Sequence, residues 1–123
     1  MKKIIYLLTT ILLTFFSNNS LIASEKKDQY SCKPKHAAAI RSNGIKTIKI
    51  KGTEKPVLLT IYKGFLETND MKYKLYEAGG RAFAFSPERA WVHFQDITVL
   101  DNGQLSFVMA VNSSISRYLC DKK

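Results

Sequence analysis

From residue 45 onward, hydrophobic and polar residues alternate in most of the short segments between turn residues, while 57–62 is apolar on both faces, as a buried strand would be. Alternation directs successive side chains to opposite faces, and it is typical of β-strands with one buried face. The turn at Asn102 and Gly103 has the composition of a hairpin connection, so segments that follow one another are expected to pair. The predicted strands are 45–51, 57–62, 71–76, 81–85, 91–99, 105–111 and 115–120.

Residues 30–42 have a less distinctive pattern. A strand begins at Tyr30, but Pro34 and the alanines that follow it, before the turn at Asn43, fit a short helix. The same residues also fit a strand that ends in an Asn-Gly turn. We favour the strand, because everything downstream is β-like.

These segments give about eight strands in up-and-down order, joined by connections of hairpin length. Such a meander must close or fold over to bury its apolar face and protect its edges. Tyr30 and Cys32 lie two residues apart near the start, and Tyr118 and Cys120 lie two residues apart near the end, so each pair shares a strand face. We therefore predict an all-β fold, a small antiparallel barrel that is closed or nearly closed, with a two-sheet sandwich as the alternative.

The beginning of the chain has the order of a secretory signal peptide. Two lysines precede a 13-residue apolar run at 4–16, and polar and small residues follow at 17–24. Such a run is too short to span a bilayer, which needs about 20 residues. We expect residues 1–24 to be removed. Residues 25–123 would then form a single β-rich domain without a membrane span, in the periplasm of a bacterium or secreted from it.

Cys32 and Cys120 are the two cysteines of the chain. An even number of cysteines in an exported chain indicates a disulfide, and the wide separation excludes a C-x-x-C redox motif. In the chain-entropy account, closing a loop of this length removes about 4–5 kcal/mol of unfolded-state entropy. We predict a Cys32–Cys120 disulfide that joins the first and last strands.

The chain is basic, with 19 Lys and Arg against 10 Asp and Glu and a formal net charge of +9. Lys49 and Lys51, and likewise Lys72 and Lys74, repeat at a spacing of two on the polar sides of two predicted strands. If those strands share a sheet face, the lysines form a patch that contacts an anionic polymer or an acidic protein. Lysines on outward faces also keep small β domains soluble without binding anything. Nucleic acid is disfavoured, because only Tyr76 accompanies the lysines as a candidate for base stacking.

No residues form a recognisable catalytic or metal-binding motif. The two histidines, His36 and His93, are far apart in the sequence, and both cysteines are assigned to the disulfide. His93 and Asp96 are three positions apart on one predicted strand and are expected to face opposite sides. We therefore predict a protein that is not an enzyme, with no catalytic residues, no bound metal and no cofactor.

Two further groups of residues are candidates for contact with a ligand. Five aromatic residues in the second half of the chain can fill the core or line a ligand cavity inside the barrel. Glu88, Arg89 and Trp91 lie in or beside a predicted loop, and Arg and Trp are frequent in interface hot spots. The same loop also fits an ordinary proline turn before a core tryptophan. The five aromatic residues are Phe83, Phe85, Trp91, Phe94 and Phe107.

The Tyr-x-Cys start, the small β meander and the closing cysteine resemble the layout of bacterial periplasmic inhibitors of c-type lysozyme. The resemblance covers only the two ends of the chain. Those inhibitors carry a Ser-Gly-x-Gly-Ala-Arg-Tyr-like loop, and the nearest stretch here, 78–83, lacks the serine and the tyrosine. Because c-type lysozymes are basic, they and this basic domain would repel each other. The resemblance therefore transfers no function.

Taken together, the sequence predicts an exported, non-enzymatic binding or interaction domain of unknown partner, with a mild preference for anionic surfaces or acidic proteins. The first alternative is a small carrier that holds an apolar ligand inside the barrel. The second alternative is an inhibitor of a cell-wall hydrolase, which the positive charge disfavours.

Overall fold

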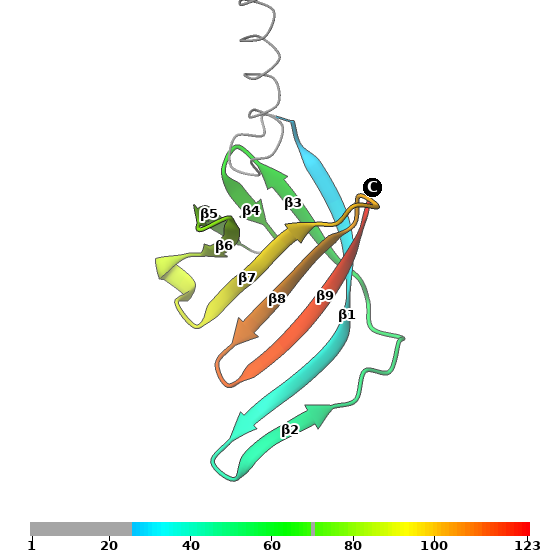
Figure 1. The fold of residues 1–123 in the computed structure, drawn as a ribbon, viewed down its shortest axis with the longest axis vertical. Coiled ribbons are helices and arrows are strands. Elements are labelled where there is room, and N and C mark those ends of the chain that lie inside the picture. Colours follow the sequence, from blue (N-terminus) through cyan, green and yellow to red (C-terminus); the bar gives the residue numbers. More distant parts are fainter. Residues whose placement is uncertain (1–25, 70) are drawn as a thin grey trace, which may run out of the picture.

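The computed structural model describes residues 26–69 and 71–123, which form nine β-strands and one 3-10 turn (Figure 1). The signal peptide predicted for residues 1–24 lies outside the described residues. The elements are β1 (Asp28–Arg41), β2 (Gly44–Ile48), β3 (Val57–Tyr62), β4 (Phe65–Glu67), β5 (Lys72–Ala78), β6 (Arg81–Phe85), η1 (Pro87–Arg89), β7 (Val92–Val99), β8 (Leu105–Val111) and β9 (Ser114–Lys122).

Eight of these strands close into an antiparallel barrel. Each strand from β3 to β8 pairs with the next one along the chain, and β1 pairs with both β3 and β9. Closure pairs both sides of every strand in the ring, so the described barrel offers no long edge to another chain. The predicted up-and-down barrel is confirmed, and the two-sheet sandwich is wrong.

The ninth strand, β2, lies outside the ring. Among the described strands it pairs only with the second half of β1, and all of its residues are exposed. The alternating pattern predicted a strand as far as Lys51, but β2 ends at Ile48, the last residue that pairs with β1. Together, β2 and the second half of β1 form a hairpin that extends beyond the rest of the barrel wall (Figure 1).

β1 is one continuous strand of 14 residues, so the ambiguous segment at 34–41 is a strand and not a helix. Its pairing with β9 shifts register between Pro34 and His36, which marks a bulge. Proline lacks the N–H that a ladder requires, and a bulge is where a strand can accommodate it. Beyond the bulge, Ala37 and Ala39 turn inward and are buried.

Cys32 of β1 and Cys120 of β9 lie directly opposite each other and form a disulfide. Both side chains are fully buried. The bond closes the barrel covalently where its first and last strands meet, as the sequence predicted. Disulfides of this kind are typical of proteins in oxidising compartments.

Aromatic rings occupy much of the barrel interior. The ring centroid of Phe94 lies 4.9 Å from that of Tyr73 and 5.5 Å from that of Phe107, and Phe107 lies 5.1 Å from Tyr118. Such pairs contribute about 0.5–1.5 kcal/mol beyond simple burial. Phe94 and Phe107 are therefore core residues that contact other core side chains. The least exposed aliphatic residues around them are Leu59, Ile61, Leu66 and Leu105.

On strand β6 the aromatic residues point away from the core and not into it. Its alanines, Ala82 and Ala84, point into the barrel and are buried, while Phe83 and Phe85 point outward and are half-buried. Larger side chains from β5 and β7 already occupy the space beneath β6, and close packing leaves room there only for small ones. Trp91 is 54% exposed and also lies outside the core. Three of the five aromatic residues considered for the interior are therefore not in it.

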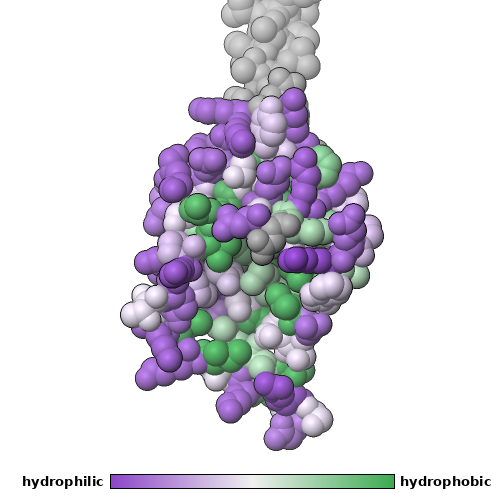
Figure 2. All heavy atoms as spheres, turned by 180° about the vertical axis from the view of Figure 1, so that it is seen from behind, coloured by the Kyte–Doolittle hydropathy of each residue, from purple (hydrophilic) through white to green (hydrophobic). Residues whose placement is uncertain are grey.

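Other hydrophobic residues also reach the surface. Seen from behind, hydrophilic residues cover the margins of the domain and hydrophobic residues gather along its middle (Figure 2). The most exposed of the large hydrophobic residues described is Ile45 of β2, at 76%. Every small domain leaves some apolar surface in water. An exposed apolar cluster indicates a binding site only where charged or polar side chains that could contact a ligand lie beside it.

Candidate functional site

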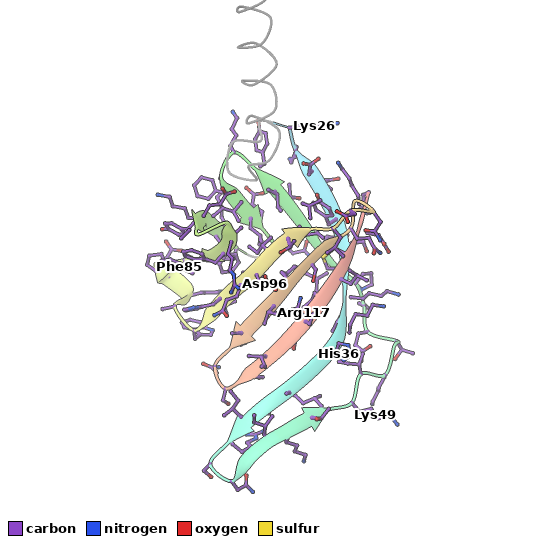
Figure 3. The ribbon with its side chains drawn as sticks, viewed as in Figure 1. Lys26, His36, Lys49, Phe85, Asp96 and Arg117 are labelled. Atoms are coloured by element: carbon purple, nitrogen blue, oxygen red, sulfur yellow. A yellow bond between two sulfur atoms is a disulfide. The ribbon has the colours of Figure 1, made fainter. Side chains whose placement is uncertain are left out.

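The structure separates the four lysines that the sequence suggested as one patch. Lys49 and Lys51 lie in the connection between β2 and β3, whereas Lys72 and Lys74 lie on β5. Three strands, β1, β3 and β4, stand between β2 and β5 in the sheet order. In Figure 3, Lys49 is far from Phe85, whose strand pairs with β5. The lysines therefore form two separate pairs, and only the pair on β5 belongs to the site described below.

The loop residues Glu88, Arg89 and Trp91 come together in the turn between β6 and β7. Glu88 and Arg89 belong to η1, where the Arg89 N–H donates to the Ser86 carbonyl at 3.0 Å. The Trp91 carbonyl accepts a hydrogen bond from the Asn112 N–H at 3.1 Å, and the Trp91 side chain reaches solvent. A core tryptophan is therefore the wrong interpretation, and the loop remains a candidate contact beside the site.

Five aromatic residues cover the outer side of the barrel wall from β3 to β6, and we call them the outer aromatic face. The ring of Tyr76 stacks on those of Phe83 and Phe85, with centroids 5.4 and 5.1 Å away and planes inclined by 15° and 17°. Each of the five is half-buried, so part of every ring reaches solvent. The outer aromatic face consists of Tyr62, Phe65, Tyr76, Phe83 and Phe85.

Tight turns fix the positions of these rings. β5 and β6 are joined by Gly79 and Gly80, with φ of 59° and 76°, a left-handed region that glycine enters without a steric penalty. Two consecutive residues with positive φ characterise the type I′ hairpin turn, whose twist matches that of the strands. The resulting register places Tyr76 directly opposite Phe83. A two-residue turn that begins at Lys63, φ 49°, joins β3 to β4 in the same way.

Lysine ammonium groups lie among the rings. Lys72 Nζ is 4.7 Å from the centroid of Phe65, and Lys74 Nζ is 5.5 Å from that of Tyr76. Lys74 is also the cross-strand neighbour of both Phe65 and Phe85. Exposed cation–π contacts of this kind are worth about 0.5–1 kcal/mol. Nucleic acid was disfavoured because only Tyr76 was expected beside the lysines. In the structure, Phe65 and Phe85 also lie beside them, so this reason does not hold.

An extra residue in β7 creates a pocket beside the outer aromatic face. The register of β7 shifts against β6, between Ala82 and Ala84, and against β8, between Gln95 and Thr98. The residue at this bulge is Asp96, with φ 52°. A bulge interrupts strict alternation and redirects the side chains that follow it.

Because of this bulge, Asp96 lies on the outer side of the sheet, and Ile97 takes the inward position and is buried. The expectation that His93 and Asp96 face opposite sides is therefore wrong, since alternation assumes an unbroken strand. Both residues line one pocket of about 330 Å³. The residues that line it are Arg81, Ala82, Phe83, Ala84, Phe85, His93, Phe94, Gln95 and Asp96.

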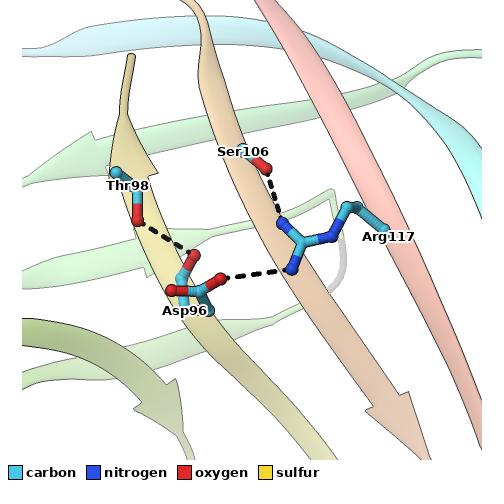
Figure 4. A network of polar contacts seen from close by, with 4 residues as sticks. All are labelled: Asp96, Thr98, Ser106 and Arg117. Atoms are coloured by element: carbon cyan, nitrogen blue, oxygen red, sulfur yellow. Dashed lines mark hydrogen bonds and ion pairs between the residues drawn. The ribbon is translucent and has the colours of Figure 1, made fainter.

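Polar contacts hold the polar side of this pocket in place. Arg117 reaches across β8, donating from Nη2 to Asp96 Oδ2 at 3.2 Å and from Nη1 to Ser106 Oγ at 2.9 Å (Figure 4). The Thr98 hydroxyl donates to the Asp96 carbonyl oxygen at 3.3 Å. An ion pair this exposed contributes about 0–1 kcal/mol. Its main effect is to orient the Asp96 carboxylate. His93 is oriented separately, by an Nε2–H bond of 2.6 Å to a backbone carbonyl.

A second exposed apolar region lies on the outer side of the β1–β2 hairpin. Ile40 faces Ile45 across the hairpin, and Ala38 faces Ile115 of β9. A groove of about 470 Å³ runs beside them, with His36 and other residues of β1, β2, β8 and β9 along it. The exposed large residues of this region are aliphatic, so it offers contact area without the stacked rings of the outer aromatic face.

Sequence reasoning missed most of the outer aromatic face. A signal was present in residues 81–85, where alanines alternate with phenylalanines and one of the two sets must lie outside. Alternation alone does not say which set that is, and hydrophobicity favours placing the phenylalanines inside. The decision depends on the large side chains of β5 and β7, which no local pattern reveals.

Within residues 26–69 and 71–123, no group of three or more His, Cys, Asp or Glu is arranged to hold a metal ion. No helix in that part of the chain is long and apolar enough to cross a membrane. No family model, curated protein or solved structure matches this chain.

Proposed function

We propose that this protein is an exported, non-enzymatic binding domain that holds an anionic polymer on its outer aromatic face. The observation that carries the proposal is the placement of Lys72 and Lys74 over rings of that face. The rings offer apolar contact, and the ammonium groups attract negative charge, that of Lys72 less strongly because it also pairs with Glu67 Oε1 at 3.5 Å. Partly exposed apolar side chains rimmed by charge are typical of interaction surfaces.

The shape of the face suits an extended ligand. One cross-strand row runs from β3 to β7 on the outer side of the barrel, with every neighbour directly opposite the next. Strands are about 4.8 Å apart, so the row is about 20 Å long, which is several units of an extended polymer. The row consists of Tyr62, Phe65, Lys74, Phe85 and His93.

The face is built on paired strands of a closed barrel and not on loops. Backbone pairing and the disulfide hold the rings in place before any ligand arrives. A ligand that meets a preordered surface loses less of its binding energy to ordering the protein. Removal of residues 1–24 takes Lys2 and Lys3 from the formal net charge of +9 and leaves 17 Lys and Arg against 10 Asp and Glu, or +7. This charge adds a long-range attraction for polyanions that speeds encounter.

Two observations support the details of the proposal. The buried disulfide favours an oxidising compartment, which agrees with the signal-like beginning of the chain. The rings of Tyr76, Phe83 and Phe85 lie against one another nearly in parallel. A platform for nucleic-acid bases instead presents separate ring faces to solvent. We therefore favour a polyanion other than nucleic acid.

Titration calorimetry of the oxidised protein against polygalacturonate, dextran sulfate and polyphosphate tests the proposal. We expect at least one polymer to bind at low salt and the affinity to fall as salt rises, because charges further apart than about 8 Å are screened at 0.15 M. Lys72→Gln combined with Lys74→Gln should weaken binding about tenfold, which corresponds to 1.4 kcal/mol.

The matched control is Lys49→Gln combined with Lys51→Gln, which removes the same charge from the β2–β3 connection. This control should change the affinity by less than about twofold if position and not net charge governs binding. Equal losses in the two double variants, or no binding of any of these polymers at low salt, would overturn the proposal.

A further inference from the structure

We propose that the pocket at the β6–β7 bulge binds a single pyranose ring, so that the ligand of the outer aromatic face is an acidic polysaccharide. This inference rests on the proposed function and adds the chemical class of the polymer's repeating unit. The pocket, at about 330 Å³, is at the small end of the range for ligand pockets, about 300–1,000 Å³. It therefore suits one ring and not a longer segment of chain.

The two sides of the pocket differ in chemistry. Phe83 and Phe85 provide an apolar side made of aromatic rings. Gln95, Asp96 and His93 come from the neighbouring strand β7 and provide a polar side. Phe85 lies opposite His93 across β6 and β7, and Figure 3 shows Asp96 further along β7, between Phe85 and Arg117 of β9.

A pyranose ring matches both sides. Its C–H groups form an apolar face that packs against an aromatic ring, while its rim carries neighbouring hydroxyls that donate and accept hydrogen bonds. The Gln95 amide both donates and accepts, and the Asp96 carboxylate accepts. Asp96 Oδ2 already accepts from Arg117, whereas Oδ1 has no hydrogen-bond partner within the described part of the chain. That oxygen is available to a sugar hydroxyl.

The backbone at Asp96 gives independent support. Its φ of 52° lies in the left-handed region, which glycine adopts most easily and which aspartate tolerates better than most other residues. Here the bulge carries a carboxylate, oriented by Arg117, in place of the smallest side chain. Bulges beside functional sites commonly redirect one side chain in this way.

The charges around the pocket indicate how an acidic polysaccharide would lie. The pocket lining carries one anionic side chain, Asp96, and one cationic side chain, Arg81, so the unit bound beside Asp96 presents hydroxyls to that carboxylate. Lys74 is the cross-strand neighbour of Phe85 on the opposite side from His93. A carboxylate or sulfate on the adjoining sugar unit therefore meets Lys74, while the ring in the pocket contacts Phe85. A pyranose with a charged neighbour satisfies both requirements, whereas a bare polyphosphate satisfies only the second.

Nuclear magnetic resonance of the oxidised protein tests this inference, with the Gln95 side-chain amide as the reporter. The titrants are short oligosaccharides of galacturonate, glucose and N-acetylglucosamine, together with single-stranded oligothymidylate and polyphosphate. We expect at least one oligosaccharide to shift the Gln95 amide and the His93 ring. Gln95→Ala should weaken that binding about tenfold, or 1.4 kcal/mol, and Gln29→Ala, on the exposed side of β1, should leave it unchanged. The Gln95 side chain makes no hydrogen bond within the described residues, so its removal leaves the fold intact.

The outcomes separate this inference from the proposed function. If polyanions bind and lose affinity in the Lys72 and Lys74 variant, but no oligosaccharide shifts Gln95, the pyranose pocket is wrong and the proposed function stands. If only oligothymidylate shifts the pocket resonances, the ligand class is wrong. If only neutral oligosaccharides shift Gln95 and the Lys72 and Lys74 variant binds them equally well, the pyranose pocket is supported and the acidic character of the polysaccharide is overturned.

Discussion

Strands β6 and β8 stand on either side of β7 and use their phenylalanines in opposite ways. Phe107 of β8 points into the barrel and is 1% exposed, whereas Phe85 of β6 points outward and is half-buried. The alanines of β6 take the inward places that large side chains take on β8. The hydrophobic content of a strand therefore does not show its role, because the same residue type stabilises the fold on β8 and is available to a ligand on β6.

Removing the disulfide should have the largest effect on stability. The disulfide lies in the core beside β8, the strand whose phenylalanine is buried. Cys120 lies opposite Cys32 on β1 and opposite Leu105 on β8. Cys32→Ala combined with Cys120→Ala should lower the free energy of unfolding by about 4–5 kcal/mol, because the bond closes a long loop. Urea unfolding followed by fluorescence measures the change. Retention of wild-type stability would show that pairing of β1 with β9 needs no covalent support.

Replacing one phenylalanine by alanine on each of β8 and β6 compares the two strands directly. Phe107→Ala should lower the free energy of unfolding by about 3–5 kcal/mol, because it leaves a cavity in the core. Phe85→Ala should lower it by about 1 kcal/mol or less, because it removes only a partly exposed stacking contact. The same unfolding experiment measures both. Comparable losses would mean that Phe85 is a structural residue.

Enlarging an alanine tests the comparison from the opposite direction. Ala84→Leu, inside the barrel on β6, should cost about 1–3 kcal/mol of stability, because the core there is already filled. Ala110→Leu, on the outer side of β8, should stay within about 0.5 kcal/mol of the wild-type value. Thermal unfolding of the two variants under one set of conditions compares them. A neutral Ala84→Leu would indicate empty space beneath β6.

The smallest expected effect is a dependence on alkaline pH that originates beside Phe107. Burial raises the pKa of the Tyr118 phenol, whose ring stacks on Phe107, above its ordinary value of 10.0. Burial also raises the pKa of Tyr30, aided by the charge of Asp28 and opposed by that of Lys122. The unfolded chain therefore loses these protons first as pH rises.

Stability from the two phenols should consequently be complete below about pH 10 and should fall as pH rises above that value. Tyr118→Phe should reduce the steepness of this alkaline loss, as measured by urea unfolding between neutral pH and pH 11. The variant's own stability at neutral pH serves as the baseline. An unchanged alkaline slope in Tyr118→Phe would contradict this assignment.

Local patterns in the sequence were sufficient for the frame of the fold. Alternation located the strands, and the Tyr-x-Cys spacing at both ends identified the strands that join, because a period of two fixes which side chains share a face. The end of β2 was not predictable, since Lys49 and Lys51 continue the alternation after the pairing with β1 has stopped at Ala37, although β1 itself continues. The alternating pattern indicates which residues can form a strand, but it does not indicate where a second strand is available to pair with them.

The candidate site required information that spans several strands. The bulge at Asp96 adds one residue against both β6 and β8, and nothing in residues 91–99 marks it as an interruption. The outward position of Phe83 depends on the large inward side chains of β5 and β7, which meet beneath β6 and which the pattern of residues 81–85 does not report. The lysines illustrate the same limit, since equal spacing on two strands does not show whether those strands are neighbours.

The most direct test of the central claim is calorimetry of polygalacturonate binding to the double variant Phe83→Ala and Phe85→Ala. The control is Ile45→Ala, which removes an exposed apolar side chain from β2. For the double variant we expect a loss of about tenfold or more in affinity, at least 1.4 kcal/mol, and a loss of no more than about 2 kcal/mol in the free energy of unfolding, since both stacking contacts of Tyr76 are removed. For Ile45→Ala we expect wild-type affinity. Wild-type affinity in the double variant would contradict the assignment of the outer aromatic face as the binding surface.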